Sequence, residues 1–279
     1  MHGTEAVLLT TPAPAAHGAT SDVVIEAVGV HHAYEGQDGW VNALQNFEIA
    51  IPRNEFLCLL GPSGCGKSTL QNMIAGFEKP SSGQVTVDGR AITSPGADRG
   101  MVFQHANLMP WLPVWENVAF HLLLRGSQKL MRREAAQRYI DMVGLTGFEN
   151  HYPSELSGGM NQRVGIARAL LMNPQVILMD EPFGALDEQN RMDMQNELVG
   201  IWQKHAGTIV FVTHSVDEAL TLGTHVAVIT ARPGRIRKLI PIDLPRPRDI
   251  TSPRFNDIKR HILSLLRPER VEAGPVSME

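Results

Sequence analysis

One nine-residue stretch, Gly61-Pro62-Ser63-Gly64-Cys65-Gly66-Lys67-Ser68-Thr69, constrains this chain more than any other. It follows an apolar run at 56–60 and precedes a segment of helical character at 70–77. The order strand, glycine-rich loop, helix, with the spacing Gly-x4-Gly-Lys-Ser, is the pattern of a phosphate-binding P-loop. Glycines let successive backbone N–H groups form a nest for anionic oxygens, and the positive end of the helix adds to it. We therefore expect Lys67 to reach the β- and γ-phosphates of a nucleotide and Ser68 to bind Mg²⁺.

Length, charge and cysteine content narrow the class of protein. A chain of 279 residues can bury a sizeable core, and its net charge of −4 disfavours a general nucleic-acid binder. No apolar run approaches the roughly 18 residues of a membrane span, so we expect that the chain does not cross a bilayer. Cys58 and Cys65 are the only cysteines, which suits a reducing compartment and offers no metal-ligand set. Residues 1–20 lack the basic start of a signal peptide and indicate a loose leader.

The secondary-structure pattern is that of an α/β protein. β-Branched and apolar runs predict strands at 22–28, 45–52, 176–179 and 208–213, and the last two read as strands buried on both faces. Apolar residues at spacings of three and four predict helices at 116–124 and 132–143. A turn is expected at 36–42, and an amphipathic helix near the C-terminus is followed by a frayed end at 271–279.

Further polar residues stand where strands and helices end or begin. Asp180 and Glu181 follow the buried run at 176–179, and two buried carboxylates need a cation nearby, which in a P-loop protein is Mg²⁺. Gln104 ends a short apolar strand. His214 ends the strand at 208–213, at the edge where open α/β sheets bind ligands. Ser157-Gly158-Gly159 opens a helix and, taken alone, is either an ordinary N-cap or a second anion site.

Together these residues resemble the ATP-binding cassette (ABC) ATPases. The P-loop, Gln104, Leu156-Ser157-Gly158-Gly159, Leu178 to Pro182, Asp187 and His214 stand in that family's order and spacing over about residues 22 to 245. The resemblance implies an α/β fold with a RecA-like mixed sheet, an antiparallel β subdomain and a helical subdomain inserted at 105–173. It also implies a cassette domain over 21–250, followed by a C-terminal helix and tail over 251–279.

The resemblance further implies a role for each matching position. Tyr34 would stack on the adenine of ATP, Gln104 would touch Mg²⁺ and the attacking water, and Asp180 would hold Mg²⁺ together with Ser68. Glu181 would be the general base, and His214 would contact the γ-phosphate. Ser157, Gly158 and Gly159 would bind the γ-phosphate of ATP held by a second subunit, with Asp187 coupling the two sites. Met160 stands where glutamine is commoner in the family, so this side chain cannot donate an amide hydrogen bond.

Several tracts are most similar to the nitrate/taurine/alkanesulfonate importer group of that family. They are Val102 to His105, Leu108 to Trp111, Glu116 to Val118, Asp180 to Asp187 and Ala231 to Ile236. This likeness implies a second ATPase subunit, expected to be identical, and separate transmembrane permease subunits. It also implies an indirect link to a periplasmic solute-binding protein, no nucleic acid, and a place on the cytoplasmic face of the inner membrane. Two alternatives stay open: an efflux or lipid-transport ATPase, and a soluble ABC ATPase acting on nucleic acid or ribosomes.

Two smaller expectations concern side chains near the expected site. Trp111 and Trp115 lie in a proline-rich tract, and core filling and contact with a partner are equally good explanations for them. Cys65 stands beside the start of the P-loop helix, whose positive end would favour some thiolate character. We therefore expect alkylation of Cys65 to slow hydrolysis and ATP to protect against it.

Overall fold

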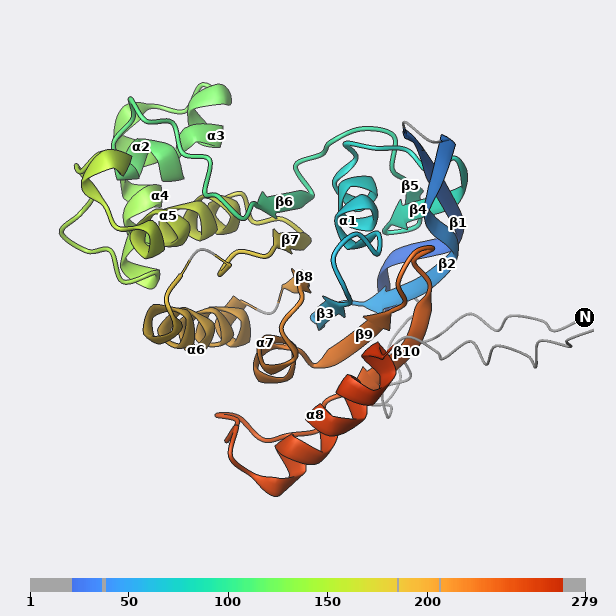
Figure 1. The fold of residues 1–279 in the computed structure, drawn as a ribbon. Helices are drawn as coiled ribbons and strands as arrows, with labels where there is room; N and C mark the ends of the chain where they lie inside the picture. Colours follow the sequence, from blue (N-terminus) through green and yellow to red (C-terminus); the bar gives the residue numbers. More distant parts are fainter. Residues whose placement is uncertain (1–21, 37–38, 185, 206, 268–279) are drawn as a thin grey trace, which may run out of the picture.

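The computed structural model describes residues 22–36, 39–184, 186–205 and 207–267 (Figure 1). The leader expected at 1–20 and the frayed end expected at 271–279 lie outside the described residues. The strands are β1 (Val23–Gly36), β2 (Gly39–Pro52), β3 (Phe56–Leu60), β4 (Ser82–Val87), β5 (Arg90–Ala91), β6 (Arg99–Val102), β7 (Val176–Asp180), β8 (Thr208–Thr213), β9 (His225–Ile229) and β10 (Ile236–Pro241). The helices are α1 (Lys67–Ala75), α2 (Val114–Val118), α3 (Phe120–Leu124), α4 (Lys129–Met142), a 3₁₀ turn (Pro153–Glu155), α5 (Gly158–Leu171), α6 (Glu188–His205), α7 (Val216–Leu222) and α8 (Pro253–Leu266).

The strands form two sheets of different kinds. Six strands lie in the order β10-β9-β3-β8-β7-β6, and they are parallel except for β10, which pairs antiparallel with β9. The other sheet is antiparallel, in the order β2-β1-β4-β5. Helices α2 to α5 gather at the side of the molecule opposite β1, β2 and β4 (Figure 1). This mixed sheet with an antiparallel sheet and a helical region confirms the expected α/β fold class, whereas the expected domain boundaries stay a prediction.

Strand β3 shows how the six-stranded sheet divides the core. Phe56, Cys58 and Leu60 face a core shared with α2 and α4 to α8, while Leu57 and Leu59 face a core shared with α1 and the antiparallel sheet. All five side chains are fully buried. Because successive side chains of a strand point to opposite faces, a strand covered on both sides must be apolar throughout. This is why the runs before the P-loop and at 208–213 could be predicted as strands with their exact ends.

Two local predictions were wrong. The turn expected at 36–42 is largely strand, because β1 continues to Gly36 and β2 begins at Gly39, with Val41 and Asn42 paired to β1. The single helix expected at 116–124 is two short helices, α2 and α3, which meet at Ala119. Ala119 has φ −87° and ψ 11°, away from helical values, and no glycine or proline marks this break in the sequence.

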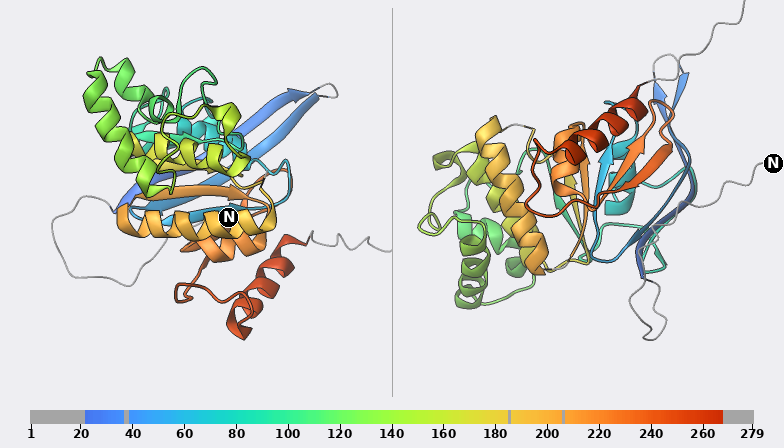
Figure 2. Two further views of the ribbon diagram at one scale, coloured as in Figure 1. Left: turned by 90° about the vertical axis from the view of Figure 1, so that its left-hand side faces the viewer. Right: turned by 90° about the horizontal axis from the view of Figure 1, so that it is seen from below.

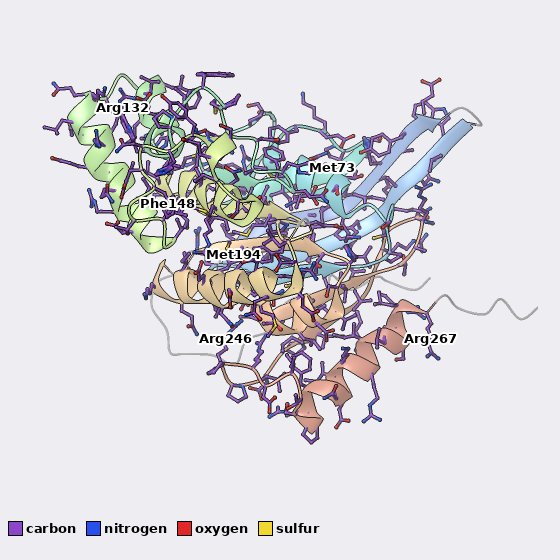
Figure 3. The ribbon with its side chains drawn as sticks, turned by 60° about the vertical axis from the view of Figure 1, so that its left-hand side comes forward. Met73, Arg132, Phe148, Met194, Arg246 and Arg267 are labelled. Carbon is purple, nitrogen blue, oxygen red and sulfur yellow. The ribbon has the colours of Figure 1, made fainter. Side chains whose placement is uncertain are left out.

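The segment after β10 holds helix α7 in place. The guanidinium of Arg248 donates to the carbonyl oxygens of Leu220 and Gly223, at 2.5 and 2.7 Å, and Arg246 donates to those of Thr221 and Leu222. Arg246, which is labelled in Figure 3, also places its guanidinium over the ring of Trp202 on α6, at 5.4 Å from the ring centroid. Burial lowers the pKa of Arg248 to about 10. The last carbonyls of a helix have no partner within it, so these two arginines complete the C-terminal end of α7.

Helix α8 packs on the outside of α7 and β9 (Figure 2). Phe255 and Ile262 are its buried residues, which confirms the amphipathic C-terminal helix predicted from the sequence. The ammonium of Lys259 lies 2.6 Å from a carboxylate oxygen of Asp217 in the first turn of α7. Within the described residues, no helix is both long enough and apolar enough to span a membrane.

Candidate functional site

The candidate site lies along one edge of the six-stranded sheet. The P-loop follows β3, His214 follows β8, Asp180 and Glu181 stand at the end of β7, and Gln104 follows β6. These four strands are parallel neighbours in the order β3-β8-β7-β6, so their carboxyl ends meet at the same edge. Open α/β sheets bind ligands at this edge. The topology therefore brings together the residues predicted from four separate parts of the sequence.

The backbone of the P-loop is closed around its own lysine. The Lys67 ammonium donates to the carbonyl oxygens of Gly61 and Pro62, at 2.7 and 3.0 Å, and the residue is only 5% exposed. Gly64 and Gly66 have φ of +74° and +93°, values that side-chain-bearing residues rarely adopt. α1 begins at Lys67 directly after this turn, so its first N–H groups point to the same place.

The two carboxylates at the end of β7 have different surroundings. Asp180 accepts a hydrogen bond from the Ser68 hydroxyl at 3.4 Å, and burial, followed by the charge of Glu181, raises its pKa. Glu181 has φ of +43°, a left-handed backbone that costs free energy in a residue other than glycine. Its carboxylate oxygen Oε2 lies 3.0 Å from Nδ1 of His214, whose side chain is 61% exposed. Glu181 therefore has a strained backbone, a side chain that is 26% exposed, and the imidazole of His214 as a direct partner.

A cavity of about 440 Å³ opens over the P-loop. Its lining includes Lys67, Ser68 and Glu181 together with Tyr34. The Tyr34 hydroxyl donates to Glu78 at 2.8 Å and lies 3.1 Å from the Thr69 hydroxyl, so the ring stands beside the start of α1. Tyr34 of β1 and the P-loop residues, which are all predicted to bind ATP, therefore line the same cavity.

Sequence reasoning missed Arg232 as a member of this cavity. Its Nε donates to the carbonyl oxygen of Gly64 at 3.0 Å, and a side chain added at Gly64 would collide with its guanidinium. The only sequence signal for Arg232 is that it lies in the tract Ala231 to Ile236, which is similar to the importer group.

Gln104 and the start of α5 share a second cavity, of about 280 Å³. Gly158, Asn161 and Leu186 also line it, whereas the described residues that line the P-loop cavity do not include Ser157, Gly158 or Gly159. Ser157 is the N-cap of α5, and its hydroxyl accepts the N–H of Met160 at 3.2 Å. The chain therefore keeps its Ser-Gly-Gly segment apart from the phosphate nest of its own P-loop.

Asp187 lies directly before α6 (Glu188–His205). Its carboxylate accepts the backbone N–H and the side-chain amide of Asn190, at 3.0 and 2.6 Å, and these hydrogen bonds lower its pKa. The carbonyl oxygen of the preceding residue, Leu186, accepts a hydrogen bond from the Arg191 guanidinium at 2.7 Å. The turn before α6 is thus held by contacts within the turn and the first part of the helix.

Three other sequence expectations have clear outcomes. Trp115 is buried in the core, while Trp111 is 72% exposed, so core filling explains only the first. The expected thiolate character of Cys65 was wrong, because the residue is 1% exposed and its burial raises the pKa of the thiol despite the nearby Lys67 ammonium. Met160 is half-buried and packs beside the larger core cluster, which gives it an apolar role.

The residues fit Mg²⁺ only as part of a nucleotide complex. Ser68 and Asp180 offer oxygen atoms within 3.4 Å of each other, and oxygen is the ligand that Mg²⁺ prefers. The described residues contain no group of three or more His, Cys, Asp or Glu side chains that could hold a metal ion alone. Phosphate oxygens would therefore have to complete the coordination, which is the usual arrangement in P-loop proteins.

Comparison with known proteins assigns this site to a class. A family model described as ABC transporter matches residues 44–184. The chain therefore belongs to the ABC transporter family and carries that family's ATP-binding, ATP-hydrolysing domain.

Three curated relatives are similar over most of their length. The chain is 46% identical to the nitrate import ATP-binding protein NrtD of Synechocystis, over 89% of this chain and 97% of the relative. It is 47% identical to the aliphatic sulfonates import ATP-binding protein SsuB of Bacillus subtilis, over 82% and 89%. It is 49% identical to the taurine import ATP-binding protein TauB of Rhizobium johnstonii, over 81% and 89%.

A solved structure agrees with the fold. The dimeric post-hydrolysis state of the ATP-binding cassette MJ0796, bound to ADP and Pi, aligns with a TM-score of 0.69 at 33% identity. The alignment covers 78% of this chain and 98% of that chain. The fold of this chain thus has a solved counterpart to which ADP and Pi are bound.

Proposed function

We propose that this chain is the ATP-hydrolysing subunit of an importer that takes up a small anionic solute of the nitrate, taurine or alkanesulfonate type. The observation that carries the chemical part is the position of Glu181, which lines the P-loop cavity with Lys67 and contacts His214 at 3.0 Å. The import part rests on the relatives named for nitrate, sulfonate and taurine import. On this proposal the chain works at the cytoplasmic face of the inner membrane, on separate permease subunits.

The arrangement of residues at the carboxyl edge of the six-stranded sheet supports a hydrolytic step. The backbone nest and the Lys67 ammonium would bind the β- and γ-phosphates, and Tyr34 would offer its ring to the adenine. Glu181 would take the proton of a water that attacks the γ-phosphorus, and His214 would hold the Glu181 carboxylate and the γ-phosphate in place. Mg²⁺, when bound by Ser68 and Asp180, would neutralise charge that develops on the phosphate oxygens. Gln104, which follows the neighbouring strand β6, would contact Mg²⁺ and the attacking water.

The site is proposed to be completed by a second copy of the chain. Ser157, Gly158 and Gly159 lie outside the lining of the P-loop cavity, and their N–H groups stand at the start of a 14-residue helix. Such a helix start suits an anion. In a head-to-tail dimer each copy would offer this helix start to the ATP held by the other, and Asp187 would connect the two sites. ATP would then bridge the copies, and hydrolysis would remove the bridge.

Replacement of the general base tests this proposal. Glu181→Gln keeps the size and hydrogen-bonding atoms of the side chain but cannot take a proton, so we expect turnover to fall by about 10²- to 10⁴-fold. ATP binding should persist, and light scattering should show an ATP-dependent dimer. Lys67→Ala is the matched variant, because it should lose ATP affinity and form no dimer. A monomer at saturating ATP in Glu181→Gln would contradict the shared site.

Reconstitution tests the import part. The chain, co-expressed with its membrane subunits and placed in liposomes, should hydrolyse ATP faster when nitrate, taurine or an alkanesulfonate is supplied with a solute-binding protein. Stimulation by nucleic acid or ribosomes, without membrane subunits, would instead support the soluble alternative. Stimulation without a solute-binding protein would support the efflux alternative.

A further inference from the structure

A buried carboxylate that the proposed mechanism does not use lies beside the site. Glu218 belongs to α7, the helix that begins two residues after His214, and its side chain is 11% exposed. A buried carboxylate is costly unless it is hydrogen-bonded or paired. The Glu218 carboxylate has two groups of partners. One group lies beside His214, and the other lies on α6, next to the turn that contains Asp187.

The first direction fixes the backbone around His214. The hydroxyl of Thr213 donates to Oε2 of Glu218 at 2.5 Å, and the same hydroxyl accepts the backbone N–H of Ser215 at 3.0 Å. The hydroxyl of Ser215 in turn accepts the backbone N–H of Glu218 at 3.3 Å. The residues on both sides of His214 are therefore tied to Glu218.

The second direction reaches the start of α6. Oε1 of Glu218 lies 3.8 Å from Nε of Arg191, and the Gln195 amide donates to the same oxygen at 3.5 Å. Arg191 also donates from its other end to the carbonyl oxygen of Leu186, the residue before Asp187. Arg191 and Gln195 are four positions apart and so share one face of α6. One carboxylate thus joins the turn before α6 to the turn before α7.

Helix α7 is anchored at both of its ends. Arg246 and Arg248 bind its last carbonyls, and Lys259 of α8 pairs with Asp217 in its first turn. Because both ends of α7 are held, the whole helix cannot shift freely when Arg191 moves. A movement of Arg191 would instead move the Glu218 carboxylate relative to Thr213, next to His214.

We propose that Glu218 is a positioning residue that, together with Arg191, relays the state of the Asp187 turn to His214 and thereby to Glu181. The inference rests on the proposed function, in which the Asp187 turn faces the nucleotide of a second copy. Binding of that copy would set the position of Leu186 and Arg191, and the Glu218 carboxylate would pass this to the Thr213–Ser215 turn. Hydrolysis at one site would then depend on a correctly seated partner at the other.

Steady-state kinetics of four full-length proteins test the relay: wild type, Glu218→Gln, Arg191→Met and the double variant. Glu218→Gln keeps an acceptor for Thr213 and removes the charge that Arg191 meets. We expect each single variant to lower kcat about tenfold with KM for ATP within about twofold, and the double variant to be no worse than the lower single. The Hill coefficient for ATP should fall toward one in all three. The exposed pair Arg254 and Asp243, at 3.1 Å, supplies control variants, Arg254→Met and Asp243→Asn, expected to keep wild-type values.

Other outcomes separate the relay from a simple loss of stability. Arg191→Lys keeps a cation and should recover part of the kcat lost in Arg191→Met, and Arg191 is exposed enough for both variants to fold. Losses that multiply to about a hundredfold in the double variant would overturn the relay, as would a kcat of Glu218→Gln within about twofold of wild type. If Glu218→Gln does not fold, equal kcat values for Arg191→Met and Arg191→Lys overturn it. Wild-type protein without ATP hydrolysis would instead refute the proposed function itself.

Discussion

The glycines of the P-loop and the glycines that open α5 have very different surroundings. A Cβ added at Gly66 would lie 2.6 Å from a methyl group of Leu44 and 2.8 Å from the Ala43 carbonyl oxygen, at φ of +93°. A Cβ added at Gly158 would meet no atom within 4 Å in the described part of the chain. The fold therefore requires glycine at the first position but not at the second.

Contacts within the chain explain why the P-loop needs its glycines, but they do not explain the glycines at the start of α5. The P-loop is complete as a backbone structure, since its turn, its lysine and its glycines are fixed by contacts within the chain. The start of α5 carries glycines that no contact of the described residues explains. In the proposed dimer, a phosphate of the ATP bound by the other copy would approach the backbone at the start of α5. Glycine, which has no side chain, would leave room for that phosphate.

Gly66→Ala should have the largest effect on stability. Strained φ and close contacts with Leu44 and Ala43 should together lower the free energy of unfolding by about 3 kcal/mol, with loss of ATP binding. Gly89→Ala is the matched control, because Gly89 has φ of +70° but open space around its Cβ, and it should cost only about 1 kcal/mol. Urea denaturation measures both. Equal losses in the two variants would show that the contacts around Gly66 contribute nothing.

Gly158→Ala should separate activity from stability. We expect the free energy of unfolding to stay within about 0.5 kcal/mol of wild type, because the methyl group meets nothing in the chain and alanine suits a helix. ATP hydrolysis should fall at least about tenfold, because the methyl group would hold the facing phosphate away from the backbone. Gly200→Ala in α6, which also has open space, is the control and should leave hydrolysis unchanged. Full activity in Gly158→Ala would remove the contrast between the two regions.

Thiol labelling should show the smallest effect on the protein, but it compares the exposure of the two regions directly. Cys65 is buried and burial raises the pKa of its thiol, so a maleimide at pH 7 should leave it unlabelled in the folded protein. Ser157→Cys places a thiol at an exposed position and should label quickly, with protection by ATP in a Glu181→Gln background. The reagent is followed by mass spectrometry. Labelling of Cys65 at the rate of the introduced thiol would contradict the closed P-loop.

The fold could be predicted from sequence where one physical constraint acts alone. Phe56–Leu60 and Thr208–Thr213 were found to the residue because strands covered on both faces must be apolar throughout. The hairpin of β1 and β2 is longer than the sequence predicts, because strand pairing extends from Gly36 and Gly39 through Val41 and Asn42, within the turn expected at 36–42. The break at Ala119 has no signal in the sequence, because neither glycine nor proline stands between Val114 and Leu124.

The sequence could predict which residues form the candidate site, but not which side chains hold those residues in place. Glu181 and His214 directly follow strands, and Lys67 begins the helix after the P-loop, so the order of elements in the sequence could identify all three. Arg232, Arg191 and Glu218 could not be found in this way, because each acts through a contact with a residue far away in the sequence. In the sequence, such residues look like ordinary surface or helix residues. Only the folded structure shows which residues they contact.

The two arginines after β10 also set where a working fragment of this protein can end. A chain cut after residue 245 would retain every residue proposed to touch nucleotide, yet the final carbonyls of α7 would lose the Arg246 and Arg248 guanidinium groups. Helix α7 would then fray from its far end, and the turn that carries His214 would lose its support. The smallest active fragment is therefore longer than the stretch that bears the motifs, and truncation for crystallisation should spare the segment through α8.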